Sequence, residues 1–231
     1  LFQCHQELLC RTVFIMIRYL FGLPFGCYFM QPHDYDKDNL KIKILENFEK
    51  QPVRNDNWSK DTFIDTNIHH SYGDDDNNNF NKIDFSSLVP TYGNFIRDYF
   101  KRMSTAKKFK YDFKIVNYTC TKEDQFMIPH IHTDSNFSFI HYLQFDKKQH
   151  LGTIFLNSHS FSDYLWDKDK LTSIFDRQDL NNSYLYKEFM LGTKEDMFII
   201  FPSCVFHLVA PKKYTKERIT VVGNININES N

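Results

Sequence analysis

The sequence lacks closely spaced cysteines. Its five cysteines are scattered along 231 residues, and no C-x-x-C pair occurs among them. A zinc knuckle and a disulfide scaffold are therefore not indicated, because both need cysteines at short, regular spacings. Isolated thiols are typical of a reducing compartment, so we expect the protein to be cytoplasmic.

The sequence also lacks an excess of charge of either sign. It has 28 Lys and Arg residues against 29 Asp and Glu residues, which gives a net charge of -1. The isoelectric point is near 6.9. A chain this balanced has no global field that would attract nucleic acid or an anionic membrane. Neither is therefore expected as a partner.

An unbroken apolar run of membrane-spanning length is missing as well. Residues 8–30 form the most apolar stretch, but Arg11 and Arg18 interrupt it, and a proline and a glycine break the remainder. A membrane span needs about 20 mostly apolar residues without central charges. No small-x-small cleavage site ends the stretch, as it would in a signal peptide. A transmembrane span is thus the least favoured interpretation, behind a docking segment and a signal anchor.

The apolar content of the chain is sufficient for one domain. Hydrophobic residues make up 42% of the sequence and aromatic residues 17%, which suits a single folded domain and not a disordered chain. The chain begins with Leu1, and Met30 precedes a polar segment. Residues 1–29 are therefore expected to be an apolar leader outside the fold, and residues 30–231 to form the domain.

Hydrophobic periodicity predicts a mainly β protein with helices towards its N-terminal side. Residues 86–103 are predicted to be an amphipathic helix, because their large apolar residues share one helical face. A further helix is indicated around 163–175. Alternation of apolar and polar residues is typical of strands, and it occurs at 40–48, 110–120, 137–145, 152–156, 185–191, 196–201, 204–210 and 218–227.

The segment IPHIHTDSNF, residues 128–137, places His130, His132 and Asp134 at every second position. Alternate residues of a strand point to the same face, so neighbouring members of this series can bind one cation. Two histidines and one carboxylate with open positions are the pattern of non-haem Fe(II). The motif offers His132 with Asp134, or His130 with His132 as in a three-histidine centre. Either pair needs another histidine from a distant strand.

A second segment, FPSCVFHLVAP followed by RITVV, offers that histidine and a site for an anion. His207 lies within the apolar strand, although taken alone it is more simply a core histidine. Arg218 lies in the next strand, and Thr220 shares its face. An arginine in an apolar strand is costly unless it meets an anion. Its planar guanidinium matches a carboxylate in a bidentate pair.

The ordered set His132-x-Asp134, His207 and Arg218-x-Thr220 resembles the Fe(II)/2-oxoglutarate-dependent dioxygenase superfamily. The closest resemblance is to its prolyl-4-hydroxylase-like members of phage or marine type. EDMFIIFPSCVFHLVAPKKYTKERITVVGNI resembles the C-terminal half of such proteins, and KIVNYTCTKEDQFMIPHIHTD resembles the stretch that leads into their H-x-D.

The resemblance covers residues 110–227. The sequence departs from the family pattern at Gly152, where two glycines are common, and at Gln144, where asparagine is common. The resemblance implies a double-stranded β-helix, or jelly roll, with N-terminal helices packed on one sheet.

The resemblance also implies a ligand set and a cosubstrate. Fe(II) would be bound by His132, Asp134 and His207, with O2 and 2-oxoglutarate at the remaining positions. Arg218 and Thr220 would bind the far carboxylate of 2-oxoglutarate. Together His132, Asp134, His207 and Arg218 would form the catalytic group.

A tyrosine on the preceding strand, Tyr118 in this sequence, would add a hydrogen bond to the cosubstrate. The expected reaction is hydroxylation of an unactivated C–H bond with release of succinate and CO2. Its expected substrate is a peptide or protein side chain such as proline, or else a small molecule. The need for ascorbate and the oligomeric state stay open.

Two other functions fit parts of the pattern. A cupin-like metalloenzyme would use the three histidines without 2-oxoglutarate. A non-catalytic jelly-roll binding module would have core histidines and an Arg218 paired with a buried acid. The position of the Arg218 guanidinium separates these alternatives, because only a 2-oxoglutarate enzyme needs it exposed to the metal pocket.

Overall fold

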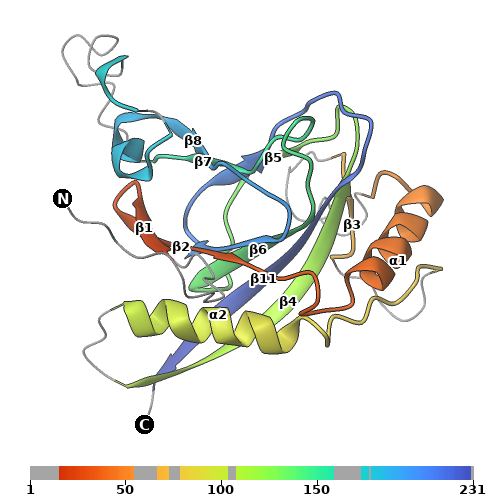
Figure 1. Ribbon diagram of the computed structural model, residues 1–231, viewed down its shortest axis with the longest axis horizontal. Helices are drawn as coiled ribbons and strands as arrows, with labels where there is room; N and C mark the ends of the chain where they lie inside the picture. Colours follow the sequence, from red (N-terminus) through yellow and green to blue (C-terminus); the bar gives the residue numbers. More distant parts are fainter. Residues whose placement is uncertain are drawn as a thin grey trace, which may run out of the picture.

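The chain folds into two antiparallel sheets with two helices on the outer face of the larger one (Figure 1). The computed structural model describes residues 16–54, 67–72, 79–103, 108–158, 173–176 and 178–229. The large sheet has the strand order β1-β2-β9-β6-β11-β4-β3, and the small sheet has the order β5-β10-β7-β8. This arrangement confirms the predicted jelly-roll class with helices packed on one sheet.

The strands of the large sheet are β1 (Met16–Leu20), β2 (Leu23–Phe29), β3 (His69–His70), β4 (Phe109–Thr121), β6 (Phe137–Gln144), β9 (Met197–Pro202) and β11 (Arg218–Glu229). The small sheet contains β5 (Met127–His130), β7 (Ile154–Leu156), β8 (Glu188–Met190) and β10 (His207–Val209). The helices are α1 (Lys37–Lys50) and α2 (Val89–Arg102), and a short 3-10 helix, η2 (Leu180–Leu185), precedes β8.

Strand β11 lies between β6 and β4 in the large sheet, and its side chains point alternately to the two faces of that sheet. Ile219, Val221 and Ile225 point to the helix side, where they are fully buried in the larger hydrophobic cluster. Arg218 and Thr220 point to the opposite side, towards the small sheet. The two-residue period of a strand thus places an apolar core on one face and polar side chains on the other.

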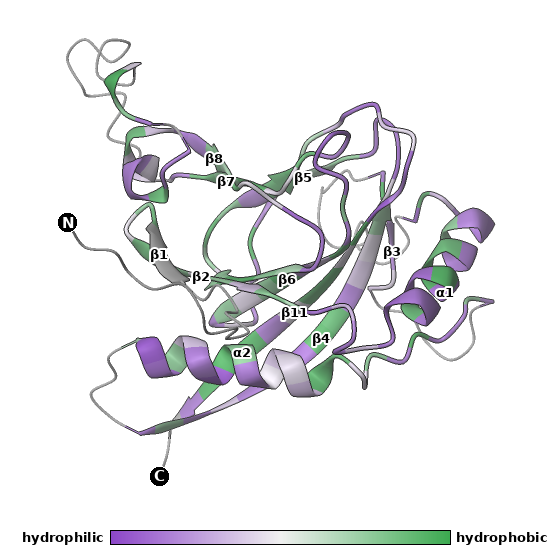
Figure 2. Cartoon of the chain, viewed as in Figure 1, coloured by the Kyte–Doolittle hydropathy of each residue, from purple (hydrophilic) through white to green (hydrophobic). Residues whose placement is uncertain are grey.

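Helix α2 confirms the predicted amphipathic helix. Phe95, Ile96, Tyr99 and Phe100 are buried on its inner face, together with Tyr92. Hydrophilic and hydrophobic residues alternate along both helices (Figure 2), as expected for helices that cover a sheet. Of the helices that the structure describes, none is long and apolar enough to cross a membrane.

Residues 40–48 form part of α1 and not the predicted strand. The stretch LKIKILENF alternates over its first residues, but the side chains that pack inward are Leu40, Ile44, Asn47 and Phe48. This spacing follows the helical period, and Ile42, which a strand would place beside Leu40 and Ile44, is 56% exposed. A five-residue alternation was therefore too short to separate the two periods.

Residues 16–29 belong to the fold, which corrects the expectation that they lie outside it. β1 and β2 form a hairpin, and β2 pairs with β9 from Gly26 opposite Ile200 to Phe29 opposite Met197. Phe25 and Tyr28 are completely buried. Residues 1–15 lie outside the described residues, as does nearly all of the helix predicted around 163–175.

The other predicted strands match β4, β6, β7, β8, β9, β10 and β11, with β7, β8 and β10 shorter than predicted. β4 contains one irregularity, since Val222 of β11 lies opposite Asn117 and Gly223 lies opposite Ile115. The extra residue, Val116, is a bulge, and it brings Val116 and Asn117 to the same pocket wall.

A partly buried ion pair joins the start of α1 to the turn before β9. Lys37 Nζ lies 2.6 Å from Asp196 Oδ2, and the Tyr35 hydroxyl donates to Asp196 Oδ1 at 2.5 Å. The His141 imidazole lies 3.7 Å from the same carboxylate. Burial alone would raise the pKa of Asp196, but His141, Lys37 and Tyr35 outweigh it and lower this pKa to about 2.

We expect Asp196→Asn to lower the free energy of unfolding by about 1–3 kcal/mol at neutral pH, because the partly buried charge of Lys37 would keep only the more exposed Glu195 as a counter-ion. Asparagine tolerates the positive φ of 62° at this position, so the loss reports the charge and not the backbone. Chemical denaturation measures it. In contrast, Lys122→Gln, in the more exposed pair with Glu217, should cost less than about 1 kcal/mol.

The Asp196 carboxylate also makes the free energy of unfolding sensitive to acid. Its pKa is lower in the folded state than the ordinary value of 3.8, so the stabilisation is complete above that pH and is lost as pH falls towards about 2. Unfolding free energy measured between these limits should fall less steeply in Asp196→Asn than in the unsubstituted chain. Parallel slopes would contradict the assignment.

Candidate metal centre and anion pocket

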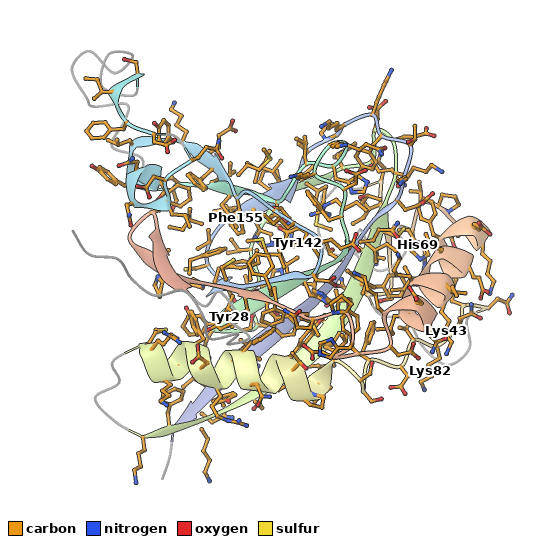
Figure 3. All side chains as sticks on the ribbon, in the orientation of Figure 1. Tyr28, Lys43, His69, Lys82, Tyr142 and Phe155 are labelled. Atoms are coloured by element: carbon orange, nitrogen blue, oxygen red, sulfur yellow. The ribbon has the colours of Figure 1, made fainter. Side chains whose placement is uncertain are left out.

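A single pocket of about 420 Å³ lies between the two sheets and collects most of the predicted site residues. Its floor comes from the inward residues of β4 and β11, and its other walls come from β5, β10 and the turn after β5. Figure 3 shows Tyr142 and Phe155 in the space between the sheets, and His69 on the α1 side. The residues brought together are His130, His132, Asp134, His207, Arg218 and Thr220.

Three histidines form the one cluster among the described residues that could hold a metal ion. His130, His132 and His207 each offer a ring nitrogen, and these nitrogens all lie within 4.8 Å of one another. His130 ends β5 and is the direct partner of His207, the first residue of β10. The ring centroids of this pair are 4.2 Å apart. The long-range pairing of β5 with β10 therefore assembles the cluster.

Hydrogen bonds fix the tautomer of two of these imidazoles. His130 Nδ1 lies 3.0 Å from the carbonyl oxygen of Ile128, and His207 Nδ1 lies 3.0 Å from that of Val205. A carbonyl oxygen only accepts, so Nδ1 carries the proton in both rings. The lone pair is then on Nε2, and each ring is oriented by the backbone two residues before it.

His132 is oriented by side chains. Its Nδ1 lies 2.7 Å from Asn224 Oδ1 and 3.0 Å from the Ser138 hydroxyl. Asn224 comes from β11 and Ser138 from β6, so the large sheet holds a ring that belongs to the turn after β5. Such hydrogen bonds behind a ligating histidine commonly set its orientation and basicity.

Burial favours the neutral form of the His130 and His207 imidazoles. Burial, with a smaller contribution from the nearby His132, lowers the pKa of His130 to about 4. Burial, with the neighbouring His130 and His132, also holds the pKa of His207 well below its ordinary value. A neutral imidazole is the form that binds a metal, so no proton has to be displaced at neutral pH.

Asp134 lies in the pocket wall but outside the cluster of three histidines. Its side chain is exposed, and its Oδ1 accepts a hydrogen bond from Asn224 Nδ2 at 3.2 Å. The structure thus brings Asp134 close to Asn224, the residue behind His132. The predicted ligand set of His132, Asp134 and His207 stays a prediction.

Arg218 provides a buried positive charge beside the cluster. It is 1% exposed, and its Nη2 donates to the Thr153 hydroxyl at 3.2 Å. Within the described residues, Nε and Nη1 have no hydrogen-bond partner and no carboxylate forms an ion pair with the guanidinium. The Tyr142 ring lies 5.3 Å from its Cζ. A buried guanidinium with two unpaired nitrogens fits a carboxylate ligand, because an unpaired buried charge is otherwise costly.

The hydroxyl of Thr220 is close to that of Thr119. Thr220 is 2% exposed and shares the pocket face with Arg218. The two threonine hydroxyl oxygens are 2.6 Å apart, and either can be the donor. The predicted pair Arg218-x-Thr220 therefore lies on one wall of the pocket, with Thr119 as an additional hydroxyl.

The prediction that Tyr118 contacts the cosubstrate is wrong. The Tyr118 hydroxyl lies on the helix side of β4, where Asn47 Nδ2 donates to it at 2.9 Å and His69 Nε2 lies 3.1 Å away. The residues of β4 that line the pocket are Val116, Asn117 and Thr119. Alternation along the strand explains the error, since neighbouring residues point to opposite faces.

Several pocket residues were missed in the sequence. Asn117 is buried and its Oδ1 has no partner within the described chain. Thr153 holds Arg218, while Ser138 and Asn224 hold His132. Asn224 could have been found by extending the alternation from Arg218 along β11. Asn117 could not, because the bulge at Val116 shifts the alternation of β4.

A family model described as putative 2OG-Fe(II) oxygenase matches residues 117–224. The matched segment contains the three histidines, Asp134, Arg218 and Thr220. The resemblance to the Fe(II)/2-oxoglutarate-dependent oxygenases is thus confirmed. No curated protein matches the chain.

Solved structures similar to this chain include prolyl hydroxylases. A Pseudomonas putida prolyl-4-hydroxylase is 12% identical with a TM-score of 0.47, and the match covers 90% of this chain and 93% of that one. A viral collagen prolyl hydroxylase from Paramecium bursaria Chlorella virus-1, in complex with 2OG, is 11% identical with a TM-score of 0.46, covering 87% and 94%.

A third similar structure is a prolyl hydroxylase from Trichoplax adhaerens in complex with a hypoxia-inducible-factor peptide fragment. It is 11% identical with a TM-score of 0.49, and the match covers 89% of this chain and 83% of that one.

We expect Asn224→Leu to weaken Co(II) binding by about 10- to 100-fold, because the hydrogen bond that orients His132 would be lost. Isothermal titration of the full chain with Co(II) measures the dissociation constant. Asn228→Ala is the matched control, since Asn228 lies on the same strand but hydrogen-bonds Asp112 outside the pocket. An unchanged dissociation constant in Asn224→Leu would show that the His132 contact does not affect the metal.

Proposed function

We propose that the protein is a non-haem Fe(II)- and 2-oxoglutarate-dependent dioxygenase that hydroxylates an unactivated C–H bond. The observation that carries this proposal is the occurrence, in one pocket, of the histidine cluster and the buried Arg218, two of whose guanidinium nitrogens have no partner among the described residues. The family model and the fold support the 2-oxoglutarate oxygenase class. When bound, iron and 2-oxoglutarate would act together with O2 to oxidise the C–H bond, with release of succinate and CO2.

The residues of the chain hold and orient these groups. His132 and His207 hold the metal in either of the two ligand sets, and the third ligand is Asp134 or His130. Arg218 donates hydrogen bonds to the far carboxylate of 2-oxoglutarate, with Thr220 beside it. The Thr153 hydroxyl keeps the guanidinium in place.

Apolar side chains complete the pocket. Ile140, Val209 and Val222 line it between the polar groups. Such a wall lowers the local dielectric and excludes water, which strengthens the attraction between Arg218 and an anionic ligand. The proposed substrate is a peptide or protein side chain such as proline.

The cupin-like alternative is favoured by one observation, the third histidine. A metal bound by His130, His132 and His207 does not by itself require a 2-oxo acid. The cupin-like alternative leaves the buried charge of Arg218 without a role, whereas 2-oxoglutarate would provide an anion for it. A binding module with core histidines is less consistent with three imidazoles that line an open pocket.

The direct test is succinate formation from 2-oxoglutarate under air with added Fe(II). We expect His207→Ala to abolish it, because this histidine belongs to both ligand sets, while His33→Ala should behave as the unsubstituted chain. His33 is a suitable control because its side chain is 70% exposed. If the unsubstituted chain gave no succinate and bound neither metal nor 2-oxoglutarate, the oxygenase would be rejected in favour of the binding module.

Replacement of Arg218 tests the cosubstrate. We expect Arg218→Met to weaken 2-oxoglutarate binding by roughly 30-fold or more, because truncating one partner of a buried charge pair costs about 2 kcal/mol at least. Co(II) affinity should change by less than about 3-fold, since Arg218 is not a metal ligand. The exposed Arg97→Met, on α2, serves as the control. Equal losses of metal and cosubstrate binding would contradict the role given to Arg218.

A further inference from the structure

We propose that the metal is bound by His130, His132 and His207, and that Asp134 is a positioning residue behind His132 and not a ligand. This inference rests on the proposed function only in so far as that function requires a metal in the pocket. It replaces the two-histidine, one-carboxylate set that the H-x-D spacing suggests.

The pairing of β5 with β10 is the first argument. His130, and not His132, lies directly opposite His207 in the ladder. Its ring centroid is 4.2 Å from that of His207, whereas the His132 centroid is 5.3 Å from it. His132 follows two residues later, in the turn after β5, so the ligand series that begins opposite His207 is His130, then His132. In this register His132 occupies the place that the carboxylate holds in an H-x-D motif.

The spacing of the nitrogens is the second argument. Nitrogens bound to one metal at about 2.0–2.1 Å lie roughly 3 Å apart. The ligand nitrogens of His130, His132 and His207 are already within 4.8 Å of one another. Small rotations of the side chains are sufficient to close this difference. No carboxylate belongs to this cluster within the described residues.

The hydrogen bonds of Asn224 give Asp134 a different role. Asn224 Nδ2 donates to Asp134 Oδ1, because a carboxylate oxygen only accepts. The amide oxygen Oδ1 of Asn224 must then face His132 Nδ1, at 2.7 Å. His132 Nδ1 consequently carries the proton, and its Nε2 lone pair is available to the metal. Asp134 thus selects the orientation of the amide, and the amide selects the tautomer of His132.

The charge of the centre follows from this assignment. Three neutral imidazoles leave the full charge of a divalent cation, whereas a carboxylate ligand would cancel one unit of it. Asp134 is the one acidic residue in the described lining of the pocket, and Arg218 adds a positive charge. A dianionic cosubstrate would then be attracted more strongly than in a carboxylate-bound centre.

The experiment measures Co(II) binding to the full chain by isothermal titration. We expect His130→Ala to weaken binding by at least about 100-fold, more than the loss of a residue behind a ligand. Asp134→Ala should cost about 10-fold, and Asp134→Asn should restore affinity to within about 3-fold, because an amide oxygen still accepts from Asn224. The control is His33→Ala, which should bind as the unsubstituted chain does.

Opposite outcomes overturn the assignment. A loss of about 100-fold or more in Asp134→Asn would identify the carboxylate as a ligand, and unchanged binding in His130→Ala would exclude this histidine. Either result leaves the proposed oxygenase intact with the carboxylate set. Failure of the unsubstituted chain to bind Co(II) would instead overturn the assignment and the proposed function together.

A measurement on the unsubstituted chain covers the case in which His130→Ala does not fold, as judged by circular dichroism. Pulsed electron paramagnetic resonance of the Cu(II)-loaded chain, labelled with nitrogen-15 in its histidine side chains, counts the coordinated imidazoles. Three support the assignment, and two overturn it.

Discussion

The pairing of β11 with both β6 and β4 is the constraint on which the core and the pocket depend. One face of this strand carries Ile219, Val221 and Ile225 into the cluster beneath the helices. The other carries Arg218 and Thr220 into the pocket. A register slip of one residue would exchange the two faces, placing a guanidinium in the apolar core and isoleucines in the pocket. The burial that stabilises the sheet therefore also holds the polar site in position.

The pocket combines groups from both sheets, and each sheet contributes a different kind of group. The small sheet supplies His130 and His207 through one strand pair. The large sheet supplies the anion-binding Arg218 and the residues that orient His132, namely Asn224 and Ser138. The metal centre and the anion site are thus linked through β11, because Arg218 and Asn224 lie on the same face of that strand. Packing between the sheets fixes their relative position.

Local sequence patterns predicted the elements whose side chains alternate over long stretches. β4, β6, β9 and β11 follow from a clear two-residue period, and α2 from a clear helical one. Residues 40–48 were predicted as a strand and not as a helix, because LKIKI alternates. The inward-facing residues of the whole segment follow the helical period. The hairpin of β1 and β2 was also missed, since its apolar character is equally typical of a leader segment.

The main residues that form the site could be predicted from the sequence. The strand pairing that decides where they point could not. Every residue of the H-x-D, distal histidine and Arg-x-Thr pattern lies in the pocket. The sequence alone left open whether His130 or His132 faces His207, because that depends on a pairing between strands far apart in the chain. Tyr118 was assigned to the wrong face for a related reason. A family pattern places a residue on a strand, but the pairing of that particular strand decides where the side chain points.

The position of β2 beside β9 has a consequence for preparing the protein. A shortened chain that began at Met30 would lose both strands of the hairpin and leave β9 as the edge of the large sheet. Phe198, Ile199 and Ile200 are completely buried in the intact fold. Their backbone would then be unpaired on one side, and the apolar surface around them would be uncovered. Such an edge is a template for pairing between molecules, so the truncated chain should precipitate where the longer chain stays in solution.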